Sequence, residues 1–244
     1  KYPRFYFSFR SPYSWIAHRL LTERVSPPLE KLEYIPFWEP DETTLSLLNQ
    51  KGGKYLYMPM SRQKHLYILQ DIKRIARALG FPMTWPIDDK KPWWELPHLA
   101  YLTARSRGRG NEFMQAVYRS RWERGENICC AETLIGIARD IDLDPQLIAF
   151  ASDDAAIREE GAAALCQADE DGVFGVPFFI SGREKFWGID RLIGFVETFK
   201  HVNSSVPTFG IQEWYSEAGT QDAIPPTLAD SGGSCDTDTA GGCG

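Results

Sequence analysis

The sequence predicts an α/β protein in which a helical segment interrupts a small β-sheet. Segments with strand character fall only near the two ends of the 244-residue chain, at residues 4–9 and 32–37 and again at 178–187. Between them, apolar residues recur at three- and four-residue steps, as amphipathic helices require. We therefore expect a helical bundle inserted into an α/β core.

Caps and periodicity place the individual helices. The clearest is residues 61–79, which Gly80 ends, and shorter helices are expected at 41–48, 99–104, 112–123, 131–141 and 145–151. Ser152 is the expected cap of one more helix, and Asp190 stands at the start of the last. Residues 83–97 are expected to form an aromatic loop, and the turn Ser181-Gly182-Arg183 joins the two final strands as a hairpin.

The first strand runs directly into the start of a helix. Ser11 stands where an N-cap belongs, and Pro12 occupies the first helical position, where a missing N–H costs nothing. A hydroxyl held there meets unpaired backbone N–H groups and the positive end of the helix dipole, which stabilise a thiolate or another anion. Ordinary capping explains the pattern Ser-Pro-x-Ser about as well. Alternation in the strand predicts one buried face: Phe5, Phe7 and Phe9 against Arg4, Tyr6 and Ser8.

Two motifs about 160 residues apart together resemble one protein family. The first is Ser-Pro-Tyr-Ser-Trp at residues 11–15; the second is Gly-Val-Phe-Gly-Val-Pro-Phe-Phe-Ile at 172–180, followed by Phe-Trp-Gly-Ile-Asp-Arg-Leu at 186–192. They are similar to the 2-hydroxychromene-2-carboxylate isomerases and the kappa-class glutathione transferases, which have a DsbA-like thioredoxin fold. In that family a serine replaces the first cysteine of Cys-x-x-Cys. The resemblance extends over nearly the whole chain, to about Leu228.

The resemblance implies a thioredoxin-like domain interrupted by an all-helical insertion. Residues 1–50 and 172–203 would form the two parts of the thioredoxin-like domain, 51–171 the insertion, and 204–244 a C-terminal extension with a low-complexity tail. In this fold the Val176–Pro177 bond is cis and lies beside Ser11, with the Val176 backbone exposed to a peptide-like ligand.

The resemblance also implies a site for glutathione or another low-molecular-weight thiol. Ser11 would hydrogen-bond the sulfur, and Asp190 would receive the γ-glutamyl ammonium. The other cofactor contacts that it implies are Lys54, Lys64, Val176 and Pro177. The sequence departs from the family in the loop 51–55 and at Ile189, where a polar residue is usual, and Lys64 also fits a solvated helix face.

The implied activity is isomerisation of a small aromatic or conjugated compound. The cofactor thiolate would add to a conjugated carbon, allow rotation about the resulting single bond, and leave. Ser11, together with the helix N-terminus, would lower the pKa of that thiol by hydrogen-bonding its sulfur. Ser11 is not expected to be the nucleophile itself, because no base stands beside it in the sequence. Tyr13, Trp85 and Trp187 are candidates for the substrate pocket, although the loop of Trp85 could equally cap the helices. A kappa-type transferase and a non-catalytic binding or maturation partner are the alternatives.

Composition argues against several other classes of protein. The formal net charge is −6 and no basic stripe is interleaved with aromatic residues, so no nucleic-acid partner is expected. No window approaches the roughly 18 apolar residues of a membrane span, and nothing near Lys1 resembles a signal peptide. We therefore expect no membrane association and a cytoplasmic location.

The cysteines and histidines indicate neither disulfide exchange nor metal binding. The five cysteines contain no Cys-x-x-Cys pair, and the four histidines lack ligand spacing, so surface or packing roles are expected for His18, His65, His98 and His201. The family resemblance implies a homodimer. The tail that carries Cys235 and Cys243 is a candidate site for a protein partner.

Overall fold

The computed structural model describes residues 2–25, 32–56, 61–86 and 88–200, and these contain a mixed sheet between layers of helices. The sheet order is β2-β1-β3-β4, with β1 parallel to β2 and antiparallel to β3. Its strands are β1 (Arg4–Phe7), β2 (Glu33–Pro36), β3 (Phe178–Ser181) and β4 (Glu184–Trp187). Strands therefore come only from the two ends of the described chain, which confirms the predicted α/β class.

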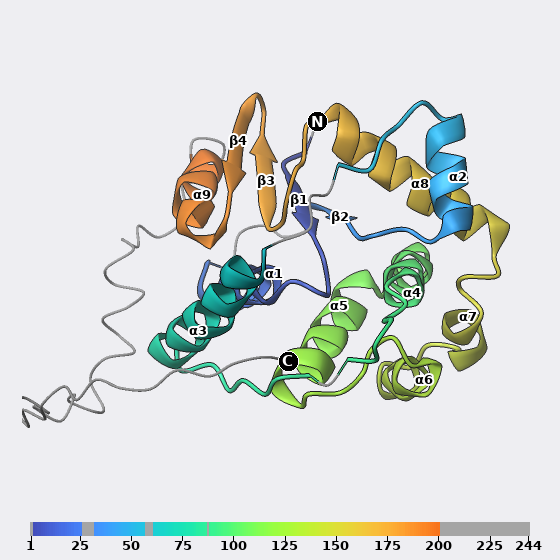
Figure 1. The fold of residues 1–244 in the computed structure, drawn as a ribbon, viewed down its shortest axis with the longest axis horizontal. Coiled ribbons are helices and arrows are strands. Elements are labelled where there is room, and N and C mark those ends of the chain that lie inside the picture. Colours follow the sequence, from blue (N-terminus) through green and yellow to red (C-terminus); the bar gives the residue numbers. More distant parts are fainter. Residues whose placement is uncertain (1, 26–31, 57–60, 87, 201–244) are drawn as a thin grey trace, which may run out of the picture.

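The helices lie at different distances from the β3–β4 edge of the sheet. Figure 1 shows α9 beside β3 and β4, while α4 to α7 gather away from that hairpin. The bounds are α1 (Pro12–Leu20), α2 (Glu42–Gln50), α3 (Arg62–Ala78), α4 (Glu95–Ser106), α5 (Gly110–Tyr118), α6 (Ala131–Asp140), α7 (Pro145–Ala149), α8 (Ala155–Glu170) and α9 (Leu192–Lys200). The described residues also form the short π-helices η1 (Leu21–Val25) and η3 (Arg119–Glu123) and the 3₁₀-helix η4 (Ile189–Arg191).

Strand β1 is buried on both faces, so the predicted half-buried strand is wrong. Phe5 stacks on Phe179 at a centroid distance of 4.7 Å, and Phe179 in turn stacks on Phe195 of α9. On the opposite face, the Tyr6 hydroxyl donates to the Asp171 carboxylate just after α8, and Arg4 pairs with the same carboxylate at 3.2 Å. These two polar side chains are buried because the carboxylate at the end of α8 accepts the Tyr6 hydroxyl and pairs the charge of Arg4 inside the protein.

Two predicted boundaries shift by a few residues. Helix α8 is capped by Asp154, whose carboxylate accepts the N–H groups of Ala156 and Ile157, and not by Ser152. Helix α4 begins at Glu95 inside the expected aromatic loop, because Pro97 lies in the first turn, where its missing N–H removes no helical hydrogen bond.

Helix α3 forms where residues 61–79 were predicted to be helical, with Ser61 as its cap, but only its second half joins the core. Ile72 and Ala76 are buried, whereas Leu66 and Tyr67 are 46% and 58% exposed. The first half of this helix therefore presents apolar side chains and the basic side chain of Lys64 to solvent.

The described helices include none that combines the length and the apolar character needed to cross a membrane. The predictions for the C-terminal extension, including Cys235 and Cys243, lie outside the described residues. The division at residues 50, 171 and 203 stays a prediction.

Candidate functional site

Ser11 forms the start of α1 as the sequence predicts. Its backbone is extended, with φ of −88° and ψ of 116°, and its Oγ accepts the Ser14 N–H at 3.2 Å. Ser14 is itself fully buried, and its own Oγ accepts the Ser8 N–H at 3.4 Å. The two serines of the motif thus differ: Ser11 caps the helix at the surface, and Ser14 ties the helix back to the end of the strand.

The fold brings Ser11 to the second motif. The Ser11 hydroxyl donates to the carbonyl oxygen of Val176 at 3.4 Å, although 165 residues separate them, and the Val176–Pro177 bond is cis as predicted. The carbonyl of Pro177 accepts the Gly188 N–H at 3.0 Å, which connects this loop to the segment that precedes Asp190.

The first turn of α1 retains a free hydrogen-bond donor. Pro12 has no N–H, the Ser14 N–H is used by Ser11 Oγ, and the Ser11 N–H donates to the Ser8 carbonyl at 3.1 Å. The Tyr13 N–H has no hydrogen-bond partner among the described residues. No acidic residue occupies this turn, so the positive end of the helix is left for an anion from outside the chain.

Ser11 is equipped to donate a hydrogen bond and not to act as a nucleophile. Its hydroxyl contacts a backbone carbonyl and a backbone N–H, and neither can accept the hydroxyl proton as a base. Within the described residues, no histidine or carboxylate hydrogen-bonds Ser11. A reactive sulfur at this position would therefore have to come from a bound thiol.

Tyr13 connects the site to α3 through Asp71. The Tyr13 hydroxyl donates to the Asp71 carboxylate at 2.8 Å, and this carboxylate also receives the Tyr67 hydroxyl at 3.3 Å and Arg74 at 3.1 Å. Burial, and then the bond to Asp71, raises the pKa of Tyr13, so the phenol stays neutral. Lys64 is exposed and lies seven residues before Asp71, which puts both on the same side of α3.

Asp190 and Trp187 lie on the segment joined to the Val176–Pro177 loop. Asp190 is in η4, which contacts α1. Its carboxylate is 67% exposed, and its one ion pair among the described residues is with its neighbour Arg191 at 3.4 Å. Trp187 meets Phe174 edge to face at 4.9 Å, and the two rings are 49% and 55% exposed. An added Cβ on Gly175 would lie 3.1 Å from the Trp187 indole nitrogen, so glycine lets this ring lie close beside the loop.

Lys54 and Trp85 make no direct contact with Ser11 among the described residues. Lys54 is exposed, and its backbone N–H donates to Asp169 of α8 at 2.8 Å. Trp85 packs edge to face on Trp122 at 6.2 Å, and Trp122 in turn stacks on Trp15 of α1 at 6.3 Å. The roles of Lys54 and Trp85 at the site stay predictions.

Three residues of the site region were not among the predictions. They are Asp71, Phe174 and His98. Asp71 and His98 reach the site only through contacts between distant segments: His98 lies 89 residues from its partner Phe9, and Asp71 lies 58 residues from Tyr13. Phe174 alone carried a local signal, because it stands inside the second motif next to Gly175.

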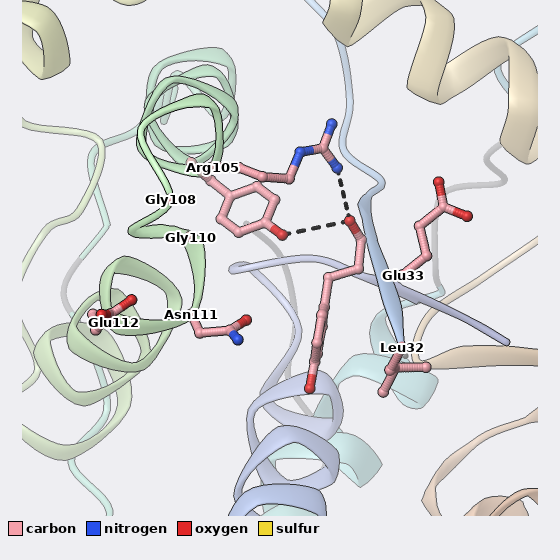
Figure 2. A pocket seen from close by; sticks show the side chains of 9 residues that line it. Leu32, Glu33, Arg105, Gly108, Gly110, Asn111 and Glu112 are labelled. Carbon is pink, nitrogen blue, oxygen red and sulfur yellow. Dashed lines mark hydrogen bonds between the residues drawn. The ribbon is translucent and has the colours of Figure 1, made fainter. Parts of the chain in front are cut away.

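A separate pocket of about 460 Å³ opens at the opposite end of the sheet (Figure 2). It lies between the start of β2, where Leu32 and Glu33 are placed, and the junction of α4 with α5. Arg105 donates to the Tyr34 carbonyl at 3.0 Å and to Glu160 at 2.6 Å, so its charge is already paired. Ser11 follows the other end of β1, so this pocket is not part of the Ser11 site.

Comparison with known proteins places this chain among thioredoxin-like proteins. A family model described as the DsbA-like thioredoxin domain matches residues 4–200. A 2-hydroxychromene-2-carboxylate isomerase from Sphingobium xenophagum is 30% identical over 198 residues, which cover 80% of this chain and 95% of the isomerase. One from Pseudomonas putida is 25% identical over 206 residues, covering 77% and 89%.

A solved structure agrees in fold. The structure of a 2-hydroxychromene-2-carboxylate isomerase superposes with a TM-score of 0.61 at 21% sequence identity, and covers 82% of this chain and 95% of its own. At this identity the likeness concerns the fold, and the residue-level argument rests on the geometry around Ser11.

Proposed function

Because the chain belongs to the DsbA-like thioredoxin family, we propose that it is a thiol-cofactor-dependent isomerase of a small aromatic or conjugated compound, with glutathione as the thiol. The observation that carries the proposal is the start of α1. There the Ser11 hydroxyl lies 3.4 Å from the Val176 carbonyl, beside an unpaired Tyr13 N–H, and no acidic side chain occupies the first turn. The curated relatives named as isomerases support the reaction class.

The donor set at this helix start fits a thiolate. One hydroxyl, one free backbone N–H and the helix dipole favour the charged form of a thiol, which lowers its pKa. When bound, glutathione would supply a thiolate that adds to a conjugated carbon, allows rotation, and leaves again. The exposed carboxylate of Asp190 would hold an ammonium group, and Lys64 a carboxylate group.

The roles of the protein in this proposal are placement and electrostatics. Ser11 would turn its proton from the Val176 carbonyl toward the sulfur, and the Val176 backbone would pair with the peptide part of the cofactor. Phe174 and Trp187 offer two exposed aromatic faces next to that loop for a flat substrate. Homodimerisation and a protein partner for residues 204–244 stay predictions.

Calorimetry with glutathione and S-methylglutathione tests the thiol site directly. We expect the wild-type protein to bind glutathione more tightly than the methylated analogue, which cannot form a thiolate. Asp190→Asn should weaken binding of both ligands by up to roughly tenfold, since one exposed charge pair is lost. Asp140→Asn, at an exposed carboxylate at the end of α6, is the matched control and should change neither.

Product analysis separates the proposal from its alternatives. An isomerase returns glutathione unchanged and converts the substrate into an isomer of equal mass, whereas a kappa-type transferase consumes glutathione in a conjugate. If glutathione produces no heat at millimolar concentration, the glutathione site is disproved, and a non-catalytic binding role or the use of a different thiol becomes the better description.

A further inference from the structure

The turn that carries Ser11 is held by side chains from the helical segment between β2 and β3. The Phe9 N–H donates to His98 Nε2 of α4 at 3.1 Å, and the Phe9 carbonyl accepts the Trp122 indole N–H at 3.2 Å. The Ser8 carbonyl accepts the Tyr118 hydroxyl at 3.4 Å. The main-chain groups of Phe9 therefore depend on partners that lie about 90 to 110 residues later in the chain.

The contacts of His98 determine which of its nitrogens carries the proton. Nδ1 faces the Trp94 carbonyl oxygen at 2.6 Å, and a carbonyl can only accept, so Nδ1 is the protonated nitrogen. Nε2 faces the Phe9 N–H, which can only donate, so Nε2 must accept. The arrangement requires neutral imidazole, and burial lowers the pKa of His98 to about 3.

The imidazole of His98 is also fixed in orientation. It is fully buried and stacks on the Trp38 ring with a centroid distance of 5.2 Å and an interplanar angle of 8°. The Trp38 indole N–H is bonded to Glu95 at 2.9 Å, one turn before His98 on α4. The ring can therefore neither rotate nor withdraw from Phe9 without breaking contacts on its other side.

We propose that His98 is a positioning residue for the thiol site: by accepting the Phe9 N–H, it fixes the turn so that Ser11 Oγ and the Tyr13 N–H converge on the thiol. The inference rests on the proposed function for the identity of the thiol. His98 makes no described contact with Ser11. It acts through the turn before Ser11, where its Nε2 accepts the Phe9 N–H at 3.1 Å and also lies 3.3 Å from the Ser8 hydroxyl.

Two amide substitutions separate the Nδ1 bond of His98 to Trp94 from its Nε2 bonds to the Phe9 N–H and the Ser8 hydroxyl. In His98→Asn the amide can occupy the place of Nδ1 and keep the Trp94 bond, but it is too short to reach Phe9. In His98→Gln the longer side chain can put its oxygen at the place of Nε2 and keep the Phe9 bond. His18→Asn is the matched control, because His18 is equally buried, its pKa is also lowered to about 3, and it makes no described hydrogen bond to the turn.

The measurement is the pH titration of the ultraviolet absorbance of the bound glutathione thiolate. We expect the pKa of the bound thiol to rise by roughly one unit in His98→Asn, a tenfold change in the thiol–thiolate equilibrium. It should stay close to the wild-type value in His98→Gln and in His18→Asn. An unchanged thiol pKa in folded His98→Asn, or an equal rise in His18→Asn, would overturn the proposal.

Amide hydrogen exchange at Phe9 distinguishes failure of this inference from failure of the proposed function. If wild type binds no glutathione, the thiol function fails, and exchange at Phe9 then decides the role of His98. Faster exchange at Phe9 in His98→Asn than in His98→Gln or His18→Asn would support the positioning role, and equal exchange would refute it. Trp122→Phe provides a second test if His98→Asn does not fold, since loss of the bond to the Phe9 carbonyl should raise the thiol pKa in the same direction.

Discussion

The starts of α1 and α2 differ in how the chain compensates the unpaired backbone N–H groups and the positive end of the helix dipole. At α2 the cap is Asp41, whose carboxylate accepts the Thr44 N–H at 2.9 Å and forms two bonds with Arg158, at 2.9 and 3.0 Å. At α1 the cap is a neutral serine, and the first turn contains no acidic residue. The chain thus supplies its own anion where α2 begins and supplies none where α1 begins.

This difference separates a structural helix start from one suited to a ligand. Burial alone would raise the pKa of Asp41, but the Arg158 hydrogen bonds and the Thr44 N–H outweigh it, so the pKa is lowered and the carboxylate stays charged. Around Ser11, the hydroxyl and the Tyr13 N–H have no comparable charge to stabilise. The uncompensated helix end at α1 is what a bound thiolate would complete.

Of the substitutions considered, removal of Arg158 should cause the largest loss of stability. Its effect should be confined to the start of α2 and should leave the start of α1 unchanged. Arg158→Met leaves Asp41 and the fully buried Glu95 without their cation, so we expect the free energy of unfolding to fall by about 3–5 kcal/mol. Arg124→Met is the control, because its half-exposed ion pair with Glu126 should be worth less than about 1 kcal/mol. Urea unfolding gives the stabilities. A large loss of glutathione affinity in folded Arg158→Met would show that the two helix starts are not independent.

Lowering the pH should destabilise the folded protein through the α1 side of this comparison, because the Ser11 turn is held by a neutral histidine. Folded His98 and His18 have a pKa of about 3, against 6.5 when unfolded, so the unfolded chain binds more protons between these values. Their contribution is present above about pH 6.5 and is lost as the pH falls toward 3. Between about pH 6.5 and pH 5 the two together should lower the free energy of unfolding by about 3 kcal/mol. Denaturant unfolding should show roughly half this slope in His98→Gln, and a flat profile in wild type would contradict the assignment.

Substitutions at Ser11 convert one kind of helix start into the other. Ser11→Asp gives α1 an anion of its own, so we expect glutathione binding to be lost while the melting temperature does not fall, since Asp is as good a cap as Ser. Ser11→Ala should weaken thiolate stabilisation by about 1.5–3 kcal/mol, because one charge-assisted bond is removed. Ser61→Ala removes a similar cap from α3 and should cost only about 1 kcal/mol of stability. Full activity in folded Ser11→Ala would mean that the site is elsewhere.

The smallest expected effect concerns the aromatic pair beside the Val176–Pro177 loop. Phe174→Ala should raise the KM for an aromatic substrate by roughly fivefold, corresponding to about 1 kcal/mol, with little change in glutathione affinity. Phe150→Ala is matched in exposure, with 57% of Phe150 exposed against 55% of Phe174, and should leave KM unchanged. Equal effects of the two variants on KM would remove Phe174 from the substrate site.

Features that depend on neighbouring residues could be predicted from the sequence. The Ser11 cap, the end of α3 before Gly80 and the hairpin turn at Gly182 all follow from side chains within three residues, and the structure confirms each. The cis bond before Pro177 was predicted from the family resemblance and is also confirmed. A local choice between similar residues was less secure, since Ser152 and Asp154 are both good caps and only the backbone geometry selects Asp154.

Features that depend on packing between distant segments could not be read in advance. The burial of Tyr6 required knowing that Asp171 would meet it from the end of α8. His98 was expected to be a surface or packing residue; it is buried, and its bond to Phe9 depends on how α4 lies against the end of β1. Sequence patterns report the face of one element and not the partner that another element brings to it.

The support of the Ser11 turn limits how the motif could be transferred to another protein. A shortened chain that joined residue 50 to residue 172 would keep all four strands described here, yet it would lose His98, Tyr118 and Trp122. The Phe9 N–H and carbonyl would then hydrogen-bond to water instead, and water would not hold the turn in one conformation. A graft of Ser-Pro-Tyr-Ser onto a minimal scaffold would transfer the serine without the side chains that hold its turn in place. The smallest transplantable unit is therefore the turn together with the faces of α4, α5 and η3 that bind it.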